Sequence, residues 1–126
     1  PSFTFIKINS FTEFLISKEG KEFIKSYKRM DSIINEIEIE IKIDQKLFQK
    51  IEEEKLYLDT LSIDFDYKKN SDILNKKSFY NLSKSINNFL DNVMVNSPEK
   101  NIKSNRVSLL SNCKKIVNYF FNFSAL

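Results

Sequence analysis

The fold is decided by residues 89–126, which read FLDNVMVNSPEKNIKSNRVSLLSNCKKIVNYFFNFSAL. Ser97, Pro98 and Glu99 supply an N-cap hydroxyl, a preset φ angle and a first-turn carboxylate, which are the usual signals of a helix start. Apolar residues then recur every three or four positions, at Ile102, Leu109, Leu110, Cys113, Ile116, Val117, Phe120 and Phe121. This spacing predicts a long helix that begins at Pro98 and buries one face. The other face is predicted to be basic and exposed, with Lys100, Lys103, Arg106, Lys114 and Lys115.

A second strong helix is predicted after Ser17, a candidate N-cap, because an apolar stripe follows at Phe23, Tyr27, Met30, Ile34 and Ile37. Before it, residues 3–16 favour another helix, although a strand over residues 3–8 or a shorter helix from a Ser10–Glu13 capping box also fits. Residues 36–44, EIEIEIKID, alternate as a strand does. A lone strand cannot satisfy its ladder groups, so we interpret them as a helix end and an extended connector.

A third helix is predicted from Asp44, which would act as its N-cap. Its expected inward residues are Leu47, Phe48, Ile51, Leu58 and Leu61, and its expected outward residues are Glu52, Glu53 and Glu54. The three glutamates could form a metal or acid–base cluster, but consecutive residues point in different directions around a helix, so a solvated face is favoured. Residues 62–72 read as a loop. A fourth helix follows, with its stripe at Phe79, Leu82, Ile86, Phe89 and Val93.

These elements predict an all-α bundle of about five helices, forming one domain over residues 1–126. Several functions are excluded by composition, because the chain has no histidine and one cysteine, Cys113. Triads that use histidine, an intrachain disulfide and a zinc site all lack their residues. No apolar run has the length of a membrane span, and no signal peptide is recognisable. We therefore expect a cytoplasmic, metal-free domain without catalytic residues. Because residue 1 is Pro1 and not methionine, we also expect a piece of a longer polypeptide.

The net charge of +3 hides an uneven distribution. Residues 1–67 carry 10 basic and 14 acidic side chains, whereas residues 68–126 carry 10 basic and 3 acidic ones. A basic half suits a polyanionic partner such as nucleic acid. A simple solvated lysine face explains the same charge and stays open as an alternative.

Four sequence blocks, in order, resemble the C-terminal end of the bacterial glycyl-tRNA synthetase β subunit. The C-terminal blocks match at Phe89, Asp91, Val93, Met94, Val95, Asn105, Arg106, Leu109, Leu110, Phe123, Ser124 and Leu126. Earlier blocks match at Ser17, Gly20, Tyr27, Lys28, Arg29, Ile33, Asp44, Leu47, Phe48, Glu53, Leu56 and Tyr57. The chain departs from the family pattern at Leu90, Val107, Lys103 and Asn122, and it has Lys84 beside the place of a family arginine.

The resemblance implies an all-helical anticodon-binding domain of the DALR type, also found on arginyl-tRNA synthetase. The expected partners are glycine tRNA, the remainder of the β subunit and the α subunit, in an α2β2 assembly. ATP and Mg²⁺ would be used by the α subunit, and no cofactor is expected in this chain. The candidate tRNA-binding residues are Lys28, Arg29, Lys84, Lys103, Asn105 and Arg106.

Binding an anticodon loop needs cations for phosphates and planar groups for unstacked bases, and Tyr27 and Tyr80 are candidate stacking platforms. The same residues allow another interpretation. Asn105 and Arg106 could bond helix carbonyls or pair with Asp91, and Tyr27 lies on a core stripe. Two other classes of function remain open: a structural module that packs within the synthetase without touching RNA, and a helical adaptor unrelated to translation.

Overall fold

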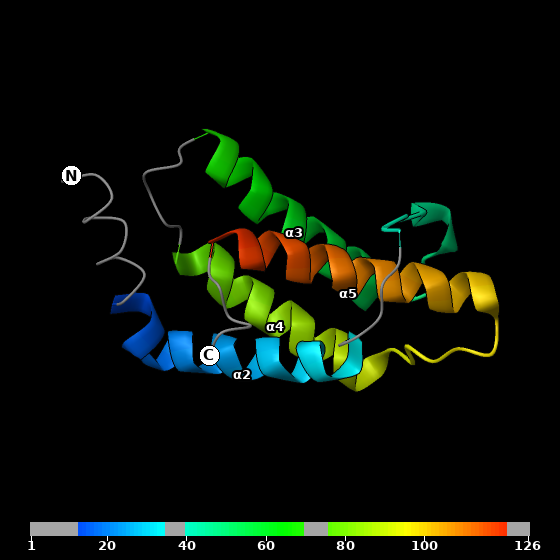
Figure 1. Cartoon of the computed structure of the whole chain (residues 1–126), viewed down its shortest axis with the longest axis horizontal. Helices are drawn as coiled ribbons and strands as arrows, with labels where there is room; N and C mark the ends of the chain where they lie inside the picture. The colour runs from blue at the N-terminus through cyan, green and yellow to red at the C-terminus, as the bar shows by residue number, and fades with distance from the viewer. Residues whose placement is uncertain (1–12, 35–39, 70–75, 121–126) are drawn as a thin grey trace.

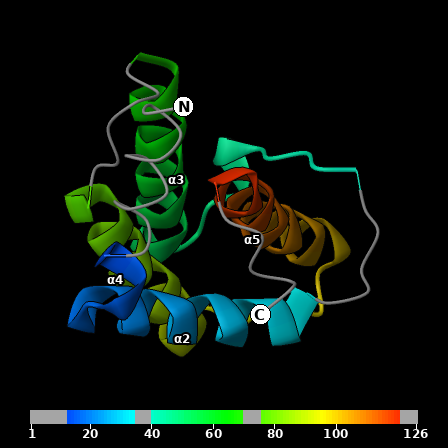
Figure 2. The same cartoon turned by 60° about the vertical axis from the view of Figure 1, so that its left-hand side comes forward.

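The computed structural model describes residues 13–34, 40–69 and 76–120. It contains α2 (Lys18–Ile34), the short 3₁₀ helix η1 (Gln45–Leu47), α3 (Ile51–Lys69), α4 (Lys76–Asn92) and α5 (Lys100–Phe120). Residues 13–16 form a helical turn before α2. α4 packs on α2 and α3, and α5 packs on the same two helices, as Figures 1 and 2 show from two sides. The predicted all-α bundle is confirmed, and the described ranges contain no strand.

The stripes predicted for α2 and α4 are confirmed as the core. Phe23, Tyr27, Met30 and Ile34 are buried on α2, and Phe79, Leu82, Ile86, Phe89 and Val93 are buried on and just after α4. Ile37 lies outside the described residues. Each helix has a single apolar stripe, so its periodicity alone fixes which face turns inward.

Three aromatic rings join the N-terminal turn to this core. The Phe14 ring lies 6.0 Å from that of Phe23 and 5.8 Å from that of Phe79, and the rings of Phe23 and Phe79 are 5.4 Å apart, centroid to centroid. These separations are typical of favourable aromatic pairs. Of the helix predicted over residues 3–16, residues 13–16 are described and are helical. Residues 3–12 lie outside the described part, and so do the strand over 3–8 and Ser10 of the capping box.

Ser17 caps α2 as predicted. Its Oγ accepts a hydrogen bond from the Gly20 main-chain N–H at 3.0 Å and donates one to the Phe14 carbonyl at 2.5 Å. The chain turns so tightly here that a Cβ atom on Gly20 would lie 1.7 Å from the Phe14 carbonyl oxygen. A hydrogen atom is therefore the largest side chain this crossing accepts.

The prediction for the third helix is wrong in three respects. Asp44 caps η1 by accepting from the Lys46 N–H at 2.9 Å, and α3 begins seven residues later, at Ile51. α3 then continues to Lys69 through most of the predicted 62–72 loop, of which residues 70–72 lie outside the described ranges. The expected faces are also partly wrong, because Glu53 is fully buried while Ile51, Leu58 and Leu61 are exposed. Glu54 is exposed and Phe48 packs against the core, as predicted.

The remaining boundaries differ little from those predicted. α5 begins at Lys100 in place of Pro98, and the Ser97 Oγ accepts from the Glu99 N–H at 3.3 Å. Such shifts of one or two residues are normal at helix ends. Residues 40–44 are irregular, in agreement with a connector, and residues 36–39 lie outside the described part. No helix in the described ranges is both long enough and apolar enough to span a bilayer.

Cys113 lies on the buried face of α5, as predicted. Burial raises the pKa of its thiol to about 12, although a hydrogen bond with Thr60 acts in the opposite direction. Because the thiolate is the reactive form, we expect native protein at pH 8 to resist iodoacetamide and to be alkylated only when it unfolds. Mass spectrometry with and without urea measures this, and rapid alkylation of the folded chain would contradict the burial.

Candidate nucleic-acid interface

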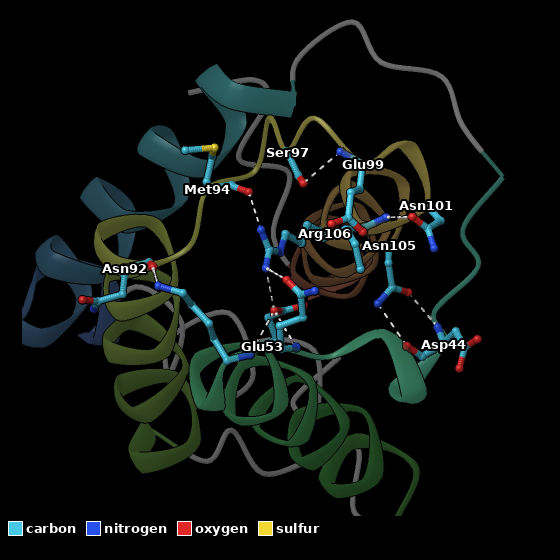
Figure 3. A network of polar contacts seen from close by, with 12 residues as sticks. Asp44, Glu53, Asn92, Met94, Ser97, Glu99, Asn101, Asn105 and Arg106 are labelled. Atoms are coloured by element: carbon cyan, nitrogen blue, oxygen red, sulfur yellow. Dashed lines mark hydrogen bonds and ion pairs between the residues drawn. The ribbon is translucent and has the colours of Figure 1, made fainter.

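Arg106 points into the protein, so its prediction as part of the exposed basic face is wrong. Its side chain is 4% exposed, and its Nη1 donates to the Met94 carbonyl at 2.8 Å. Its Nη2 donates to Oε1 of Gln49 and Oε1 of Glu53, each at 3.1 Å. The same Glu53 oxygen accepts from the main-chain N–H groups of Gln49 and Lys50, at 3.1 and 3.2 Å. Figure 3 shows that this network ties α5 to the start of α3 and to the segment after α4.

This network explains why α3 turns Glu53 inward. A buried carboxylate is strongly unfavourable unless it is paired and hydrogen-bonded. Glu53 obtains a cation from Arg106 and two N–H donors from Gln49 and Lys50, the two residues just before its own helix. The three consecutive glutamates are therefore neither a metal cluster nor a uniformly solvated face, because the middle one is a structural cap and ion-pair partner.

Asn105 is also buried, at 3% exposure, and holds the connector before η1. Its Oδ1 accepts from the Asp44 N–H at 2.7 Å, and its Nδ2 donates to the Asp44 carbonyl at 3.0 Å. One turn later, the Ser108 Oγ accepts from the Lys42 N–H at 3.2 Å. Asn105 thus satisfies the Asp44 N–H and shares the Asp44 carbonyl with the Leu47 N–H of η1, which is a structural role.

Arg29, unlike Arg106, is exposed. Its Nη2 forms an ion pair with Oδ1 of Asp91 at 2.6 Å, which links α2 to the last turn of α4. Asp91 therefore pairs with Arg29, whereas Arg106 pairs with Glu53. A second link from α2 runs to α5, where Lys114 pairs with Asp31 at 2.5 Å.

The two tyrosines considered as stacking platforms are both engaged. Tyr27 is 1% exposed, and its hydroxyl donates to Oδ1 of Asn118 at 2.6 Å, so no face of its ring is open to a base. Tyr80 is partly exposed, but the Lys84 Nζ lies 4.7 Å from its ring centroid. This is a cation–π arrangement within α4. Lys84 is itself exposed, so it remains an accessible charge.

The most regular set of exposed cations lies on α2. Lys18, Lys21, Lys25 and Lys28 are all exposed and follow each other at spacings of three, four and three residues. We call these four residues the lysine row. This spacing places them along one side of the helix over about 15 Å. In the described part of the chain, none of the four forms an ion pair with a carboxylate.

The six predicted tRNA-binding residues thus divide into two groups. Lys28, Arg29, Lys84 and Lys103 are exposed, whereas Asn105 and Arg106 are buried. Sequence reasoning found only Lys28 of the lysine row. The missed signal is the spacing of Lys18, Lys21 and Lys25, which places them on the face opposite the α2 apolar stripe.

The fold and its surface define a helical module with a basic outer helix. Its sequence is similar to glycine–tRNA ligase β subunits: 35% identical over 133 residues to the one from Rickettsia akari and 36% over 132 residues to the one from Rickettsia felis. The identity to the Rickettsia africae subunit is 32%. Each match covers 98% of this chain but only 19% of the relative's length. No family model matches the chain.

Proposed function

We propose that this chain is the tRNA-binding, anticodon-recognising module of a glycine–tRNA ligase β subunit. The observation that carries the proposal is the similarity to such subunits over 98% of the chain. The module works as part of a cytoplasmic ligase, with the rest of the β subunit and the α subunit as its partners in an α2β2 assembly. It contributes tRNA binding, while the α subunit uses ATP and Mg²⁺ to attach glycine.

The lysine row supplies a physical means of holding a polyanion. One lysine per helical turn gives a line of charges spaced about 5 Å apart along α2. Exposed ammonium groups that pair with no carboxylate of the described ranges can contact phosphates, which fix the position of RNA without reading its sequence. Arg29 lies beside the lysine row on the same helix, and it forms an ion pair with Asp91. Lys84 and Lys103 present further exposed charges on α4 and α5.

The proposal is tested by measuring the affinity for glycine tRNA over a series of salt concentrations. Replacing Lys21, Lys25 and Lys28 together by alanine removes three phosphate contacts. The log–log salt dependence should then become shallower by about 2, since each contact to a single-stranded segment contributes about 0.7. The substitutions leave α2 intact, because alanine favours a helix at exposed positions.

A matched control replaces Lys55, Lys77 and Lys115 by alanine, which removes the same charge from α3, α4 and α5. These residues are exposed and lie off the lysine row. The control should keep the salt slope of the unmodified chain. Equal losses of slope in the two triple variants would show that only net charge matters, and the lysine row would then have no special role.

The second candidate function, an interaction module within the synthetase, is favoured by a different observation. α3 exposes a line of apolar side chains at Ile51, Leu58 and Leu61. The two functions are compatible, because the lysine row and this line lie on different helices.

A further inference from the structure

A hollow lies between the connector that leads into η1 and the first turns of α5. Its volume is about 350 Å³. One wall is made by Lys42, Ile43, Asp44 and Leu47, and the other by side chains of α5. We call this space the η1–α5 hollow. Ligand sites usually measure about 300–1,000 Å³, so the hollow has room for one small ring system and little more.

A polar side of α5 forms the second wall. Asn101, Ser104, Asn105 and Ser108 are separated by three, one and three residues, which places them on one side of a helix. The first three line the hollow, and Figure 3 shows Asn101 and Asn105 on the side of α5 that faces Asp44. Asn105 and Ser108 bond the main chain of the connector. These bonds fasten the two walls together, so the hollow is formed before any ligand binds.

The outer part of the α5 wall offers hydrogen-bonding groups to a ligand. Asn101 and Ser104 are both exposed. The Asn101 Oδ1 accepts from the Ile102 N–H at 3.0 Å, which holds the amide in place. Within the described ranges, the Asn101 Nδ2 and the Ser104 hydroxyl have no hydrogen-bond partner. An amide that donates beside a hydroxyl that both donates and accepts can bond the edge of a heterocyclic base.

The connector wall is apolar where the α5 wall is polar. Ile43 and Leu47 are half-buried, and Ile43 packs against the core. A nucleobase has apolar faces and a polar edge, and proteins hold an unstacked base by contacts of these two kinds. The combination of an aliphatic surface with a nearby amide and hydroxyl therefore matches one base.

Lysines surround the hollow and are suited to the phosphates on either side of such a base. The segments 42–47 and 99–105 carry two acids, Asp44 and Glu99, and four exposed lysines: Lys42, Lys46, Lys100 and Lys103. The Asp44 carboxylate is engaged as the cap of η1, where its Oδ1 accepts from the Lys46 N–H. No lysine of the two segments pairs with a carboxylate in the part of the chain that the structure describes. A cationic ligand is disfavoured by this rim, whereas a neutral base flanked by phosphates is favoured.

We propose that the η1–α5 hollow binds one unstacked nucleotide of single-stranded RNA. The base lies against Ile43 and Leu47, Asn101 and Ser104 bond its edge, and the surrounding lysines contact the flanking phosphates. This inference rests on the proposed function, to which it adds a surface that distinguishes one base from another. The hollow is separate from the lysine row, because α5 lies between η1 and α2 (Figures 1 and 2). The two surfaces therefore contact different parts of the tRNA.

The test uses the complete synthetase that contains this chain. The probes are glycine tRNA transcripts in which each unpaired base of the anticodon loop is replaced, one at a time, by cytosine or by uracil. These two bases have the same shape but differ at one edge position, where cytosine donates and uracil accepts. Asn101→Asp keeps the shape of the side chain and its bond to Ile102, but it replaces the free donors by an acceptor. At one loop position it should shift the ratio of the two Kd values about tenfold in favour of cytosine.

The ratio of Kd values is the useful quantity because an added negative charge weakens both transcripts equally. Asn88→Asp is the matched control, since Asn88 is an exposed asparagine on α4 that does not line the hollow. It should leave the ratio unchanged at every loop position. Ser104→Ala adds no charge and removes the hydroxyl. It should reduce the discrimination between the two bases at the same loop position as Asn101→Asp and at no other.

Each possible result has one meaning. If glycine tRNA binds and the ratios at all loop positions are the same in Asn101→Asp, Ser104→Ala and the unmodified enzyme, the hollow does not hold a base, while the proposed function stands. Competition by free cytidine monophosphate at concentrations near the Kd of the tRNA would assign the hollow to a free nucleotide and would also overturn the proposal. Absence of glycine tRNA binding in the unmodified enzyme would refute the proposed function and this inference together. Resistance of Cys113 to alkylation shows that each variant remains folded.

Discussion

Arg106→Met is expected to lower the free energy of unfolding by about 3–5 kcal/mol, the usual cost of leaving a buried charge without its partner. Glu53 is fully buried, and Arg106 supplies its cation. Because methionine fills much of the volume of arginine without its charge, the loss of unfolding free energy measures the missing ion pair more than a new cavity. Urea unfolding followed by circular dichroism at 222 nm measures the effect.

Two further variants make this result specific. Arg29→Met removes the other arginine of the chain, whose ion pair with Asp91 is exposed, and it should change stability by less than about 1 kcal/mol. The double variant Glu53→Leu/Arg106→Met should be more stable than Arg106→Met alone, because no isolated charge remains. It should still lose about 1 kcal/mol relative to the unmodified chain, since Glu53 also caps α3. A loss below about 1 kcal/mol for Arg106→Met would mean that the ion pair does not hold the bundle.

The same variants bear on tRNA binding. A loss of tRNA affinity in an Arg106 variant is expected as a consequence of unfolding, because this guanidinium contacts Met94, Gln49 and Glu53. Substitutions on the lysine row change surface charge and leave the core untouched. Comparing the two kinds of variant separates RNA contacts from the support of the fold.

The sequence predicts an element well where one local pattern has one meaning. α2 and α4 each have a single apolar stripe, and the stripes predicted for them are the buried ones. α3 has apolar residues on two faces, so periodicity cannot choose between them. The choice is made by the ion pair of Glu53 with Arg106, which lies 53 residues away in the chain. A contact at that separation leaves no signal in a local window.

Prediction of the tRNA-binding residues failed for the same reason, because the burial of Arg106 also depends on a contact that is distant in the sequence. The surface assignment of Arg106 followed the general rarity of buried charges. In the structure residues 105–110 are all buried, but Asn105, Arg106 and Ser108 are polar or charged, so no apolar run indicates this burial in the sequence. Exposed lysines need no long-range partner, so Lys28, Lys84 and Lys103 could be placed on the surface from the pattern alone.

Gly20→Ala is expected to destabilise the chain by about 1.5–3 kcal/mol, against the usual trend for a helix. Alanine at a helical position normally gains up to about 1 kcal/mol over glycine. Here its Cβ would lie 1.7 Å from the Phe14 carbonyl oxygen, and the nearest atoms all belong to the main chain. The strain can be relieved by moving the 13–16 turn away from α2, which would expose the Phe14 ring. That ring is 1% exposed, and burying such a side chain contributes about 1.5–3 kcal/mol.

Urea unfolding of double variants tests whether the loss of stability comes from release of the Phe14 ring. If Gly20→Ala acts by releasing Phe14, then Phe14→Ala should cost much less in the Gly20→Ala background than in the unmodified chain, since the contact is already lost. Lys21→Ala, at the next and exposed position of α2, should be neutral or slightly stabilising and shows the effect of alanine without the clash. Additive losses for Phe14 and Gly20 would show that the strain is absorbed within α2. A Gly20→Ala variant as stable as the unmodified chain would show that the 13–16 turn leaves room for a Cβ atom at position 20, contrary to the 1.7 Å separation from the Phe14 carbonyl oxygen.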